Sequence, residues 1–221
     1  SDATPEPPGR PGKGTSRGLA FVGQKLRPPA LHYYFRIEHE GALLSWAVPK
    51  GPSLDPATKL LTMMTEPHPL DYNGFEGVIP EGEYGGGTVM IWDAGHWTPE
   101  QPDVDADLKR GDLKFKLEGK KLHGSWVLVR TRGRPGDSKP AWLLIKHRDA
   151  AATDEDVTES APRSVVSGRL LAEIAMEEGG NVAKAADADP AAEIAALVKK
   201  VRRNPPRRKR APAIWHSKAR E

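Results

Sequence analysis

The stretch LHYYFRIE at residues 31–38 brings together side chains of four chemically active kinds. On a β-strand, successive side chains point to opposite faces of the sheet. A polar face of His32, Tyr34, Arg36 and Glu38 would then lie opposite an apolar face of Tyr33, Phe35 and Ile37. An imidazole, a phenol, a guanidinium and a carboxylate together could bind an anion or a metal ion and transfer a proton. The alternative is an ordinary solvated outer face.

Two further residues could join this chemistry. His68 stands between Pro67 and Pro69, whose rings restrict the backbone. Rigid presentation suits a catalytic or anion-binding imidazole, although a single histidine in a turn is more often structural. Lys50 follows the string SWAVP, and with Arg36 it could clamp a phosphate. Guanidinium binds phosphate through two parallel hydrogen bonds, whereas ammonium acts as a point charge.

The elements that must position these residues are short and extended. Apolar residues at two-residue spacing predict eight strands, at residues 19–24, 31–38, 42–48, 60–66, 87–92, 112–118, 121–130 and 142–147. Eight short strands without helix-length patterns between them predict a mainly-β fold, a small antiparallel β-barrel with short helices, with a sandwich as the alternative. We expect the large aromatic rings to pack its core, at Trp46, Trp92, Trp97, Trp126 and Trp142.

The composition divides the chain into four segments. Residues 1–17, rich in Pro and Gly, predict a flexible arm, and residues 18–150 the barrel. Residues 151–163 predict a linker, and residues 164–221 a helical, basic C-terminal extension. In this extension we expect one short helix at residues 167–175 and a second that Asp189 caps and Pro190 opens. Asn204 and the two prolines after it would end the second helix.

The net charge of +3 is the sum of a positive charge in one segment and a negative charge in the rest of the chain. Residues 199–220 contain ten Lys and Arg and no acidic residue, so the rest of the chain holds 23 basic against 30 acidic residues, a net charge of −7. A block of like charge stays solvated or binds a polyanion. The basic extension could therefore bind the phosphate backbone of DNA without sequence preference, or serve only as a solubilising tail.

The composition also excludes several classes of protein. The chain has no cysteine, which excludes disulfides and thiolate metal sites and fits a reducing compartment. Its longest apolar runs are far shorter than the roughly 20 residues of a membrane span. The polar N-terminus lacks the apolar segment of a secretory signal. We expect a soluble, monomeric, cytoplasmic protein that is associated with the nucleoid.

Several long strings in a fixed order carry a resemblance to a known family. They are FVGQK, LHYYFRIEHEGALLSWAVPKGPSLDP, HPLDYNGFEGVIPEGEYGGGTVMIWD, LEGKKLHGSWVLVR and WLLIKHRD, with a weaker return in SVVSGRLLAEIA. With these strings, residues 21–149 resemble the 3′-phosphoesterase domain of bacterial ATP-dependent DNA ligase D (LigD) and its stand-alone relatives. The resemblance implies a manganese-dependent (Mn²⁺) β-barrel that removes 3′-phosphates or 3′-ribonucleosides from DNA ends during non-homologous end joining.

Carried over position by position, the resemblance implies a partly altered site. The three metal-ligand positions hold Leu26, His32 and Tyr34, so His32 alone keeps a ligand. A divalent cation needs several N or O ligands, and leucine provides none. A further basic position of the family is Leu60 here. The remaining polar positions match and imply roles in catalysis or in phosphate and DNA binding, at Gln24, Arg36, Lys50, His68 and Tyr72.

Two hypotheses about the site follow, and both remain open on the sequence. In the first, the chain is a working 3′-phosphoesterase whose metal uses an altered set of ligands. In the second, which we favour, metal binding and catalysis are impaired or lost and the chain binds DNA ends or a repair partner without turnover. Ku or a DNA ligase is a candidate protein partner in both. A third hypothesis assigns the function to the basic extension instead of the barrel.

Overall fold

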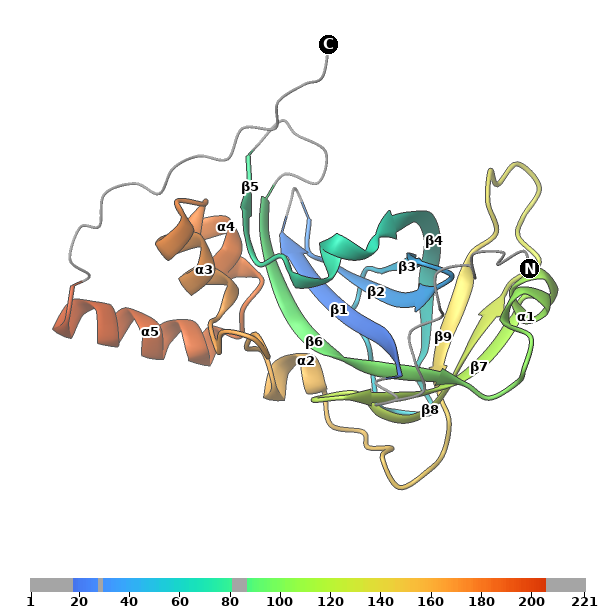
Figure 1. Cartoon of the computed structure of the whole chain (residues 1–221). Coiled ribbons are helices and arrows are strands. Elements are labelled where there is room, and N and C mark those ends of the chain that lie inside the picture. The colour runs from blue at the N-terminus through green and yellow to red at the C-terminus, as the bar shows by residue number, and fades with distance from the viewer. Residues whose placement is uncertain (1–17, 28–29, 81–86, 206–221) are drawn as a thin grey trace, which may run out of the picture.

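The computed structural model describes residues 18–27, 30–80 and 87–205. Within these ranges, nine antiparallel strands form one sheet in the order β1-β2-β3-β4-β9-β8-β7-β6-β5. They are β1 (Leu19–Arg27), β2 (His32–His39), β3 (Ala42–Val48), β4 (Lys59–Pro69), β5 (Gly77–Ile79), β6 (Gly87–Pro99), β7 (Asp112–Gly119), β8 (His123–Arg130) and β9 (Trp142–Lys146). An additional β1–β6 pairing closes eight of these strands into a barrel and leaves β5 outside it (Figure 1). The expected antiparallel β-barrel is thus confirmed.

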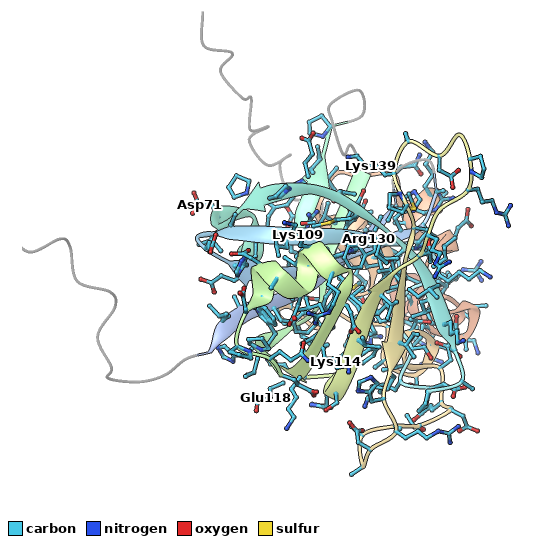
Figure 2. The ribbon with its side chains drawn as sticks, turned by 90° about the vertical axis from the view of Figure 1, so that its right-hand side faces the viewer. Asp71, Lys109, Lys114, Glu118, Arg130 and Lys139 are labelled. Atoms are coloured by element: carbon cyan, nitrogen blue, oxygen red, sulfur yellow. The ribbon has the colours of Figure 1, made fainter. Side chains whose placement is uncertain are left out.

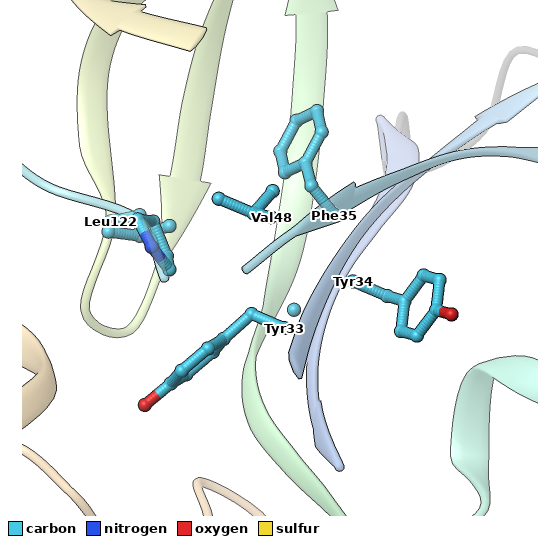
Figure 3. A pocket seen from close by; sticks show the side chains of 7 residues that line it. Tyr33, Tyr34, Phe35, Val48 and Leu122 are labelled. Atoms are coloured by element: carbon cyan, nitrogen blue, oxygen red, sulfur yellow. The ribbon is translucent and has the colours of Figure 1, made fainter. Parts of the chain in front are cut away.

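Aromatic rings fill the interior of the barrel. The five expected tryptophans, Trp46, Trp92, Trp97, Trp126 and Trp142, are all buried. Phe35 packs against Phe21, Trp46 and Phe115 with ring centroids 5.4 to 6.1 Å apart. A small apolar cavity remains inside, lined in part by Tyr33, Phe35, Val48 and Leu122 (Figure 3). The apolar face of β2 that the sequence predicts is therefore the core face.

Short helices flank the strands. They are η1 (Leu70–Gly74), α1 (Val104–Arg110), α2 (Val157–Ser160), α3 (Leu171–Glu178), α4 (Val182–Asp187) and α5 (Ala191–Arg203). The sequence analysis missed α1 and β5. The side chain of Asp103 caps α1, and Gly111 ends it in the left-handed conformation, so one short helix fits between two strands. Among the described residues, no helix is long and apolar enough to cross a membrane.

Two segments of the C-terminal part differ from what the sequence predicts. The range expected as a linker, residues 151–163, contains α2, which buries Val157 in the core. The expected helix at residues 167–175 starts later, at Leu171, because Gly168 adopts a left-handed conformation at φ +70°. The arm at residues 1–17 and residues 206–221 of the basic extension lie outside the described residues.

A buried carboxylate on β6 holds the turn between β7 and β8. Asp93 on β6 is fully buried and accepts four backbone N–H bonds at 2.9 to 3.1 Å, from Ala94, Lys120, Lys121 and Leu122. Its side chain thereby holds the turn between β7 and β8. Gly119 leaves the required space, since a Cβ there would lie 2.4 Å from Asp93 Oδ2. One carboxylate thus ties three strands together.

Replacing Asp93 tests this role. Asp93→Ala leaves several buried N–H groups without an acceptor, and we expect it to lower the free energy of unfolding by about 3–5 kcal/mol. Asp93→Asn keeps one acceptor oxygen and should cost less. Asp103→Ala, which removes one exposed helix cap, is the matched control and should cost about 1 kcal/mol. Urea denaturation measures all three variants, and an Asp93→Ala cost no larger than that of the control would contradict the role.

Candidate anion-binding site on the outer face of the barrel

Four neighbouring strands align the candidate residues on the outer face of the barrel. Gln24 on β1 lies opposite Tyr34 on β2, and Leu26 lies opposite His32. Arg36 on β2 lies opposite Ser45 on β3, and His68 on β4 lies opposite Leu43 on β3. Tyr33 and Tyr34 leave β2 in opposite directions (Figure 3). The predicted division of β2 into two faces is confirmed.

Arg36 is the centre of this site. Its side chain is buried, its Nε donates to Gln24 Oε1 at 2.8 Å, and its Nη1 donates to Ser45 Oγ at 2.7 Å. Ser45 Oγ in turn donates to the carbonyl of Leu43 at 3.1 Å. These bonds join β1, β2 and β3 and fix the orientation of the guanidinium. A guanidinium held in one position is prepared to bind an anion without a large cost in side-chain entropy.

Ser45 is a site residue that the sequence analysis missed. It is fully buried, and it is the single hydroxyl among the apolar residues of β3. The sequence did carry a signal for it, since Ser45 is the one polar residue on a strand otherwise made of Ala, Leu, Trp and Val. A buried hydroxyl needs a hydrogen-bond partner, which points to a polar contact at this position.

Tyr34 packs its ring against Arg36. The guanidinium carbon lies 4.6 Å from the ring centroid, within the range of a cation–π interaction. The phenol therefore provides Arg36 with the face of a ring at a position where a carboxylate would provide a negative charge. This contact stabilises the guanidinium more weakly than an ion pair in a buried setting would.

His32 has one ring nitrogen without a partner. Its Nδ1 is buried and has no hydrogen-bond partner among the described residues. The residue across from it, Leu26, is buried and offers no ligand atom. The His32 imidazole is thus available to a ligand on one side but has an apolar neighbour on the next strand.

His68 lies close enough to Arg36 for their charges to interact. Burial lowers the pKa of the His68 imidazole below its usual value, and the positive charge of Arg36 lowers it further. His68 Nδ1 donates to the Glu66 carbonyl at 2.9 Å, so the neutral ring carries its proton on Nδ1 and leaves Nε2 basic. An anion bound to Arg36 would raise this pKa, because its charge would offset that of the guanidinium.

The other candidate residues are placed differently. Lys50 is exposed in the turn after β3, and the pairing of Val48 with Tyr33 puts it at the same end of the sheet as His32. Leu60 is a buried member of the hydrophobic core. Tyr72 lies in η1, and its side chain falls outside the described residues. The structure therefore groups Gln24, Tyr34, Arg36 and His68, with His32 and Lys50 toward one end.

The side chains around His32 do not match the three-ligand pattern that the resemblance implies. Among the described residues, the one group of three His, Asp or Glu donors close enough to share a metal ion is His39, Glu40 and Asp105. This group lies at the hairpin between β2 and β3. It is held by a hydrogen bond of 2.8 Å between His39 Nε2 and Asp105 Oδ1, and both carboxylates are exposed.

Comparison with known proteins identifies the barrel. A family model described as the DNA ligase D 3′-phosphoesterase domain matches residues 24–130. Residues 24–130 belong to this family. The resemblance drawn from the sequence strings is confirmed.

Several multifunctional LigD proteins match a larger part of the chain. The non-homologous end joining protein LigD of Pseudomonas aeruginosa is 49% identical over 172 residues, which cover 76% of this chain and 20% of that protein. LigD of Mycobacterium tuberculosis is 42% identical over 156 residues, or 71% of this chain and 19% of that protein. LigD of Mycolicibacterium smegmatis is 38% identical over 151 residues. The chain thus spans about a fifth of the length of these curated relatives.

The coupling between Arg36 and His68 can be measured directly. Arg36→Gln removes the positive charge, so the pKa of His68 should rise toward its usual value near 6.5. Arg36→Lys keeps the charge and is the matched control, in which the pKa should stay low. NMR titration of the imidazole signals between pH 4.5 and about 8 measures both variants. A His68 pKa that is the same in both variants would show that burial alone lowers it.

Proposed function

We propose that the chain binds DNA 3′ ends during double-strand break repair by non-homologous end joining, and that metal-dependent hydrolysis of these ends is impaired or lost. The membership of the 3′-phosphoesterase family and the similarity to end-joining LigD proteins support the role at DNA ends. The observation that carries the loss of catalysis is the pair Leu26 and Tyr34 beside His32, next to an intact Arg36 network.

Each residue of the site would have its own role in binding the DNA end. Arg36 would attract the terminal 3′-phosphate with its positive charge, and His68 would add a proton to the bound phosphate or take one from it. Lys50 would provide a mobile positive charge at the edge, and Gln24 would keep the guanidinium in place. The protein would act as a monomer, and Ku or a DNA ligase would receive the bound end.

Weak metal binding would allow DNA binding and turnover to separate. In a metal-dependent phosphoesterase the cation polarises the phosphate and activates a water molecule. With one histidine left from three ligand positions, Mn²⁺ would bind weakly, because leucine gives no ligand and a neutral phenol is a poor substitute for a carboxylate. Binding through Arg36 does not depend on the cation.

A second candidate function is an active 3′-phosphoesterase that holds Mn²⁺ with a different set of ligands. The unpartnered Nδ1 of His32 favours it, because this nitrogen could coordinate a cation. This hypothesis expects manganese-dependent release of phosphate from a 3′-phosphate end by the unchanged chain, and loss of that activity in His32→Ala.

Restoring the ligand positions tests the main proposal. We expect the unchanged chain to release no phosphate from a 3′-phosphate duplex above the level of His68→Ala. The double variant Leu26→His/Tyr34→Asp should gain manganese-dependent release on the order of 100-fold over the unchanged chain, since a catalytic metal supplies several kcal/mol. Phosphate release, with and without Mn²⁺, is the measurement.

The control is Leu26→Ala/Tyr34→Ala, which disturbs the packing of the same two positions without adding a ligand. It should stay inactive. Manganese-dependent turnover by the unchanged chain would overturn the claim of lost catalysis and favour the second candidate function. Equal affinity for 3′-phosphate and 3′-hydroxyl duplexes would overturn the assignment of Arg36 as the anchor of the end.

A further inference from the structure

Among the described residues, hydrogen bonds and ion pairs tie helix α5 to its surroundings near its start. Asp189, two residues before α5, is buried and accepts backbone N–H bonds from Leu171 at 3.1 Å and from Ala172 at 2.8 Å. Its Oδ1 also lies 3.8 Å from Nζ of Lys25, and neither side chain is more than 1% exposed. In the first turn, Glu193 pairs with Arg163 at 3.1 Å. Asp189 is therefore not the helix cap that the sequence predicts, since it anchors α5 to α3 and β1.

Beyond this anchor, α5 buries none of its residues. Its 13 residues extend over about 20 Å, and in Figure 1 the helix lies on the side of the molecule away from α1. An isolated helix of this length is only marginally stable in water. Because α5 covers no core surface, its contribution to the stability of the barrel is small, and its use lies in what it presents to solvent.

The exposed end of α5 carries a set of cations. Lys199, Lys200, Arg202 and Arg203 are all exposed, and none of them takes part in an ion pair among the described residues. At 100° per residue these four side chains project from one face of the helix, opposite the apolar stripe of Ile194, Leu197 and Val201. Basic side chains in the rest of the structure often have acidic partners, for example Arg169 with Glu76, Glu177 and Glu178.

We propose that α5 is a second DNA contact, whose four cations bind the phosphate backbone of the duplex that leads to the end. The inference rests on the proposed function, because it takes the same DNA as the ligand. Charge complementarity favours this partner, because the four cations form no ion pair among the described residues and duplex DNA carries one negative charge per about 1.7 Å of its axis. The buried Lys25–Asp189 pair keeps the helix at a fixed position relative to β1.

This position links the two contacts through a single strand. Lys25 faces inward and pairs with Asp189, while its neighbours Gln24 and Leu26 face the candidate site. The strand that supports Arg36 thus also supports the root of α5. A duplex whose 3′ end lies at Arg36 would meet a second contact at a set distance, which increases affinity without adding any preference for sequence.

The test compares two variants with the same change in charge. One is Lys199→Gln/Lys200→Gln/Arg202→Gln/Arg203→Gln on α5. The matched control is Lys109→Gln/Lys114→Gln/Lys116→Gln/Lys139→Gln, which alters cations on the opposite side of the molecule, three of which are labelled in Figure 2. The probe is a blunt duplex with either a 3′-phosphate or a 3′-hydroxyl, and dissociation constants are measured across a series of salt concentrations. Far-UV circular dichroism confirms that both variants fold.

We expect the α5 variant to reduce the slope of log K against log salt by about 2 to 4, close to one unit per lost phosphate contact. The control variant should leave this slope unchanged. The ratio of affinities for the 3′-phosphate and 3′-hydroxyl duplexes should be the same in all three proteins, because that ratio reports the Arg36 site.

Two negative outcomes are distinguishable. An unchanged salt slope in the α5 variant, or an equal fall in both variants, overturns the role of α5 while a 3′-phosphate preference upholds the end-binding site. Loss of the 3′-phosphate preference in all proteins, with a salt slope that still depends on α5, overturns the proposed function of the site and leaves α5 as a DNA contact.

Discussion

The hydrogen bonds of the Arg36 guanidinium govern the arrangement of the candidate site. A buried cation is costly unless its N–H groups are satisfied, and here Gln24 and Ser45 satisfy two of them from the strands on either side. The same bonds set the mutual position of β1, β2 and β3. Both of these partners are neutral, so these two bonds orient the guanidinium without cancelling its charge. Burial lowers the pKa of His68, and the positive charge of Arg36 lowers it further.

Tyr34 packs its ring against Arg36 at a position where the family resemblance implies a carboxylate. A tyrosine ring offers its negative face to the guanidinium, but it does not reduce the charge available to a ligand as an adjacent carboxylate would. In the proposed function, Leu26 and Tyr34 would weaken metal binding, whereas the positive charge of Arg36 would still favour a phosphate.

Local periodicity predicts much of this structure, and long-range pairing accounts for what it misses. The alternation along β2 was enough to separate the core residues Tyr33, Phe35 and Ile37 from the polar face. It could not place Ser45 next to Arg36, since that contact depends on the register between two strands. Asp189 before Pro190 has the local pattern of a helix cap. Its actual partners are Lys25, Leu171 and Ala172, and the backbone N–H groups of α3 and the buried Lys25 ammonium outweigh the capping of its own helix.

The charge distribution gives this buried pair a further consequence. Residues 18–150 hold 17 basic and 17 acidic residues, so the barrel has no net charge that could attract a polyanion at long range. A basic segment on a loosely attached tail would attract DNA without orienting it. The Lys25–Asp189 pair removes that freedom for α5, because breaking it would leave an ionised group buried without a partner. The backbone N–H bonds from Leu171 and Ala172 offset part of the cost of burying Asp189, and its pairing with Lys25 fixes where α5 leaves the barrel.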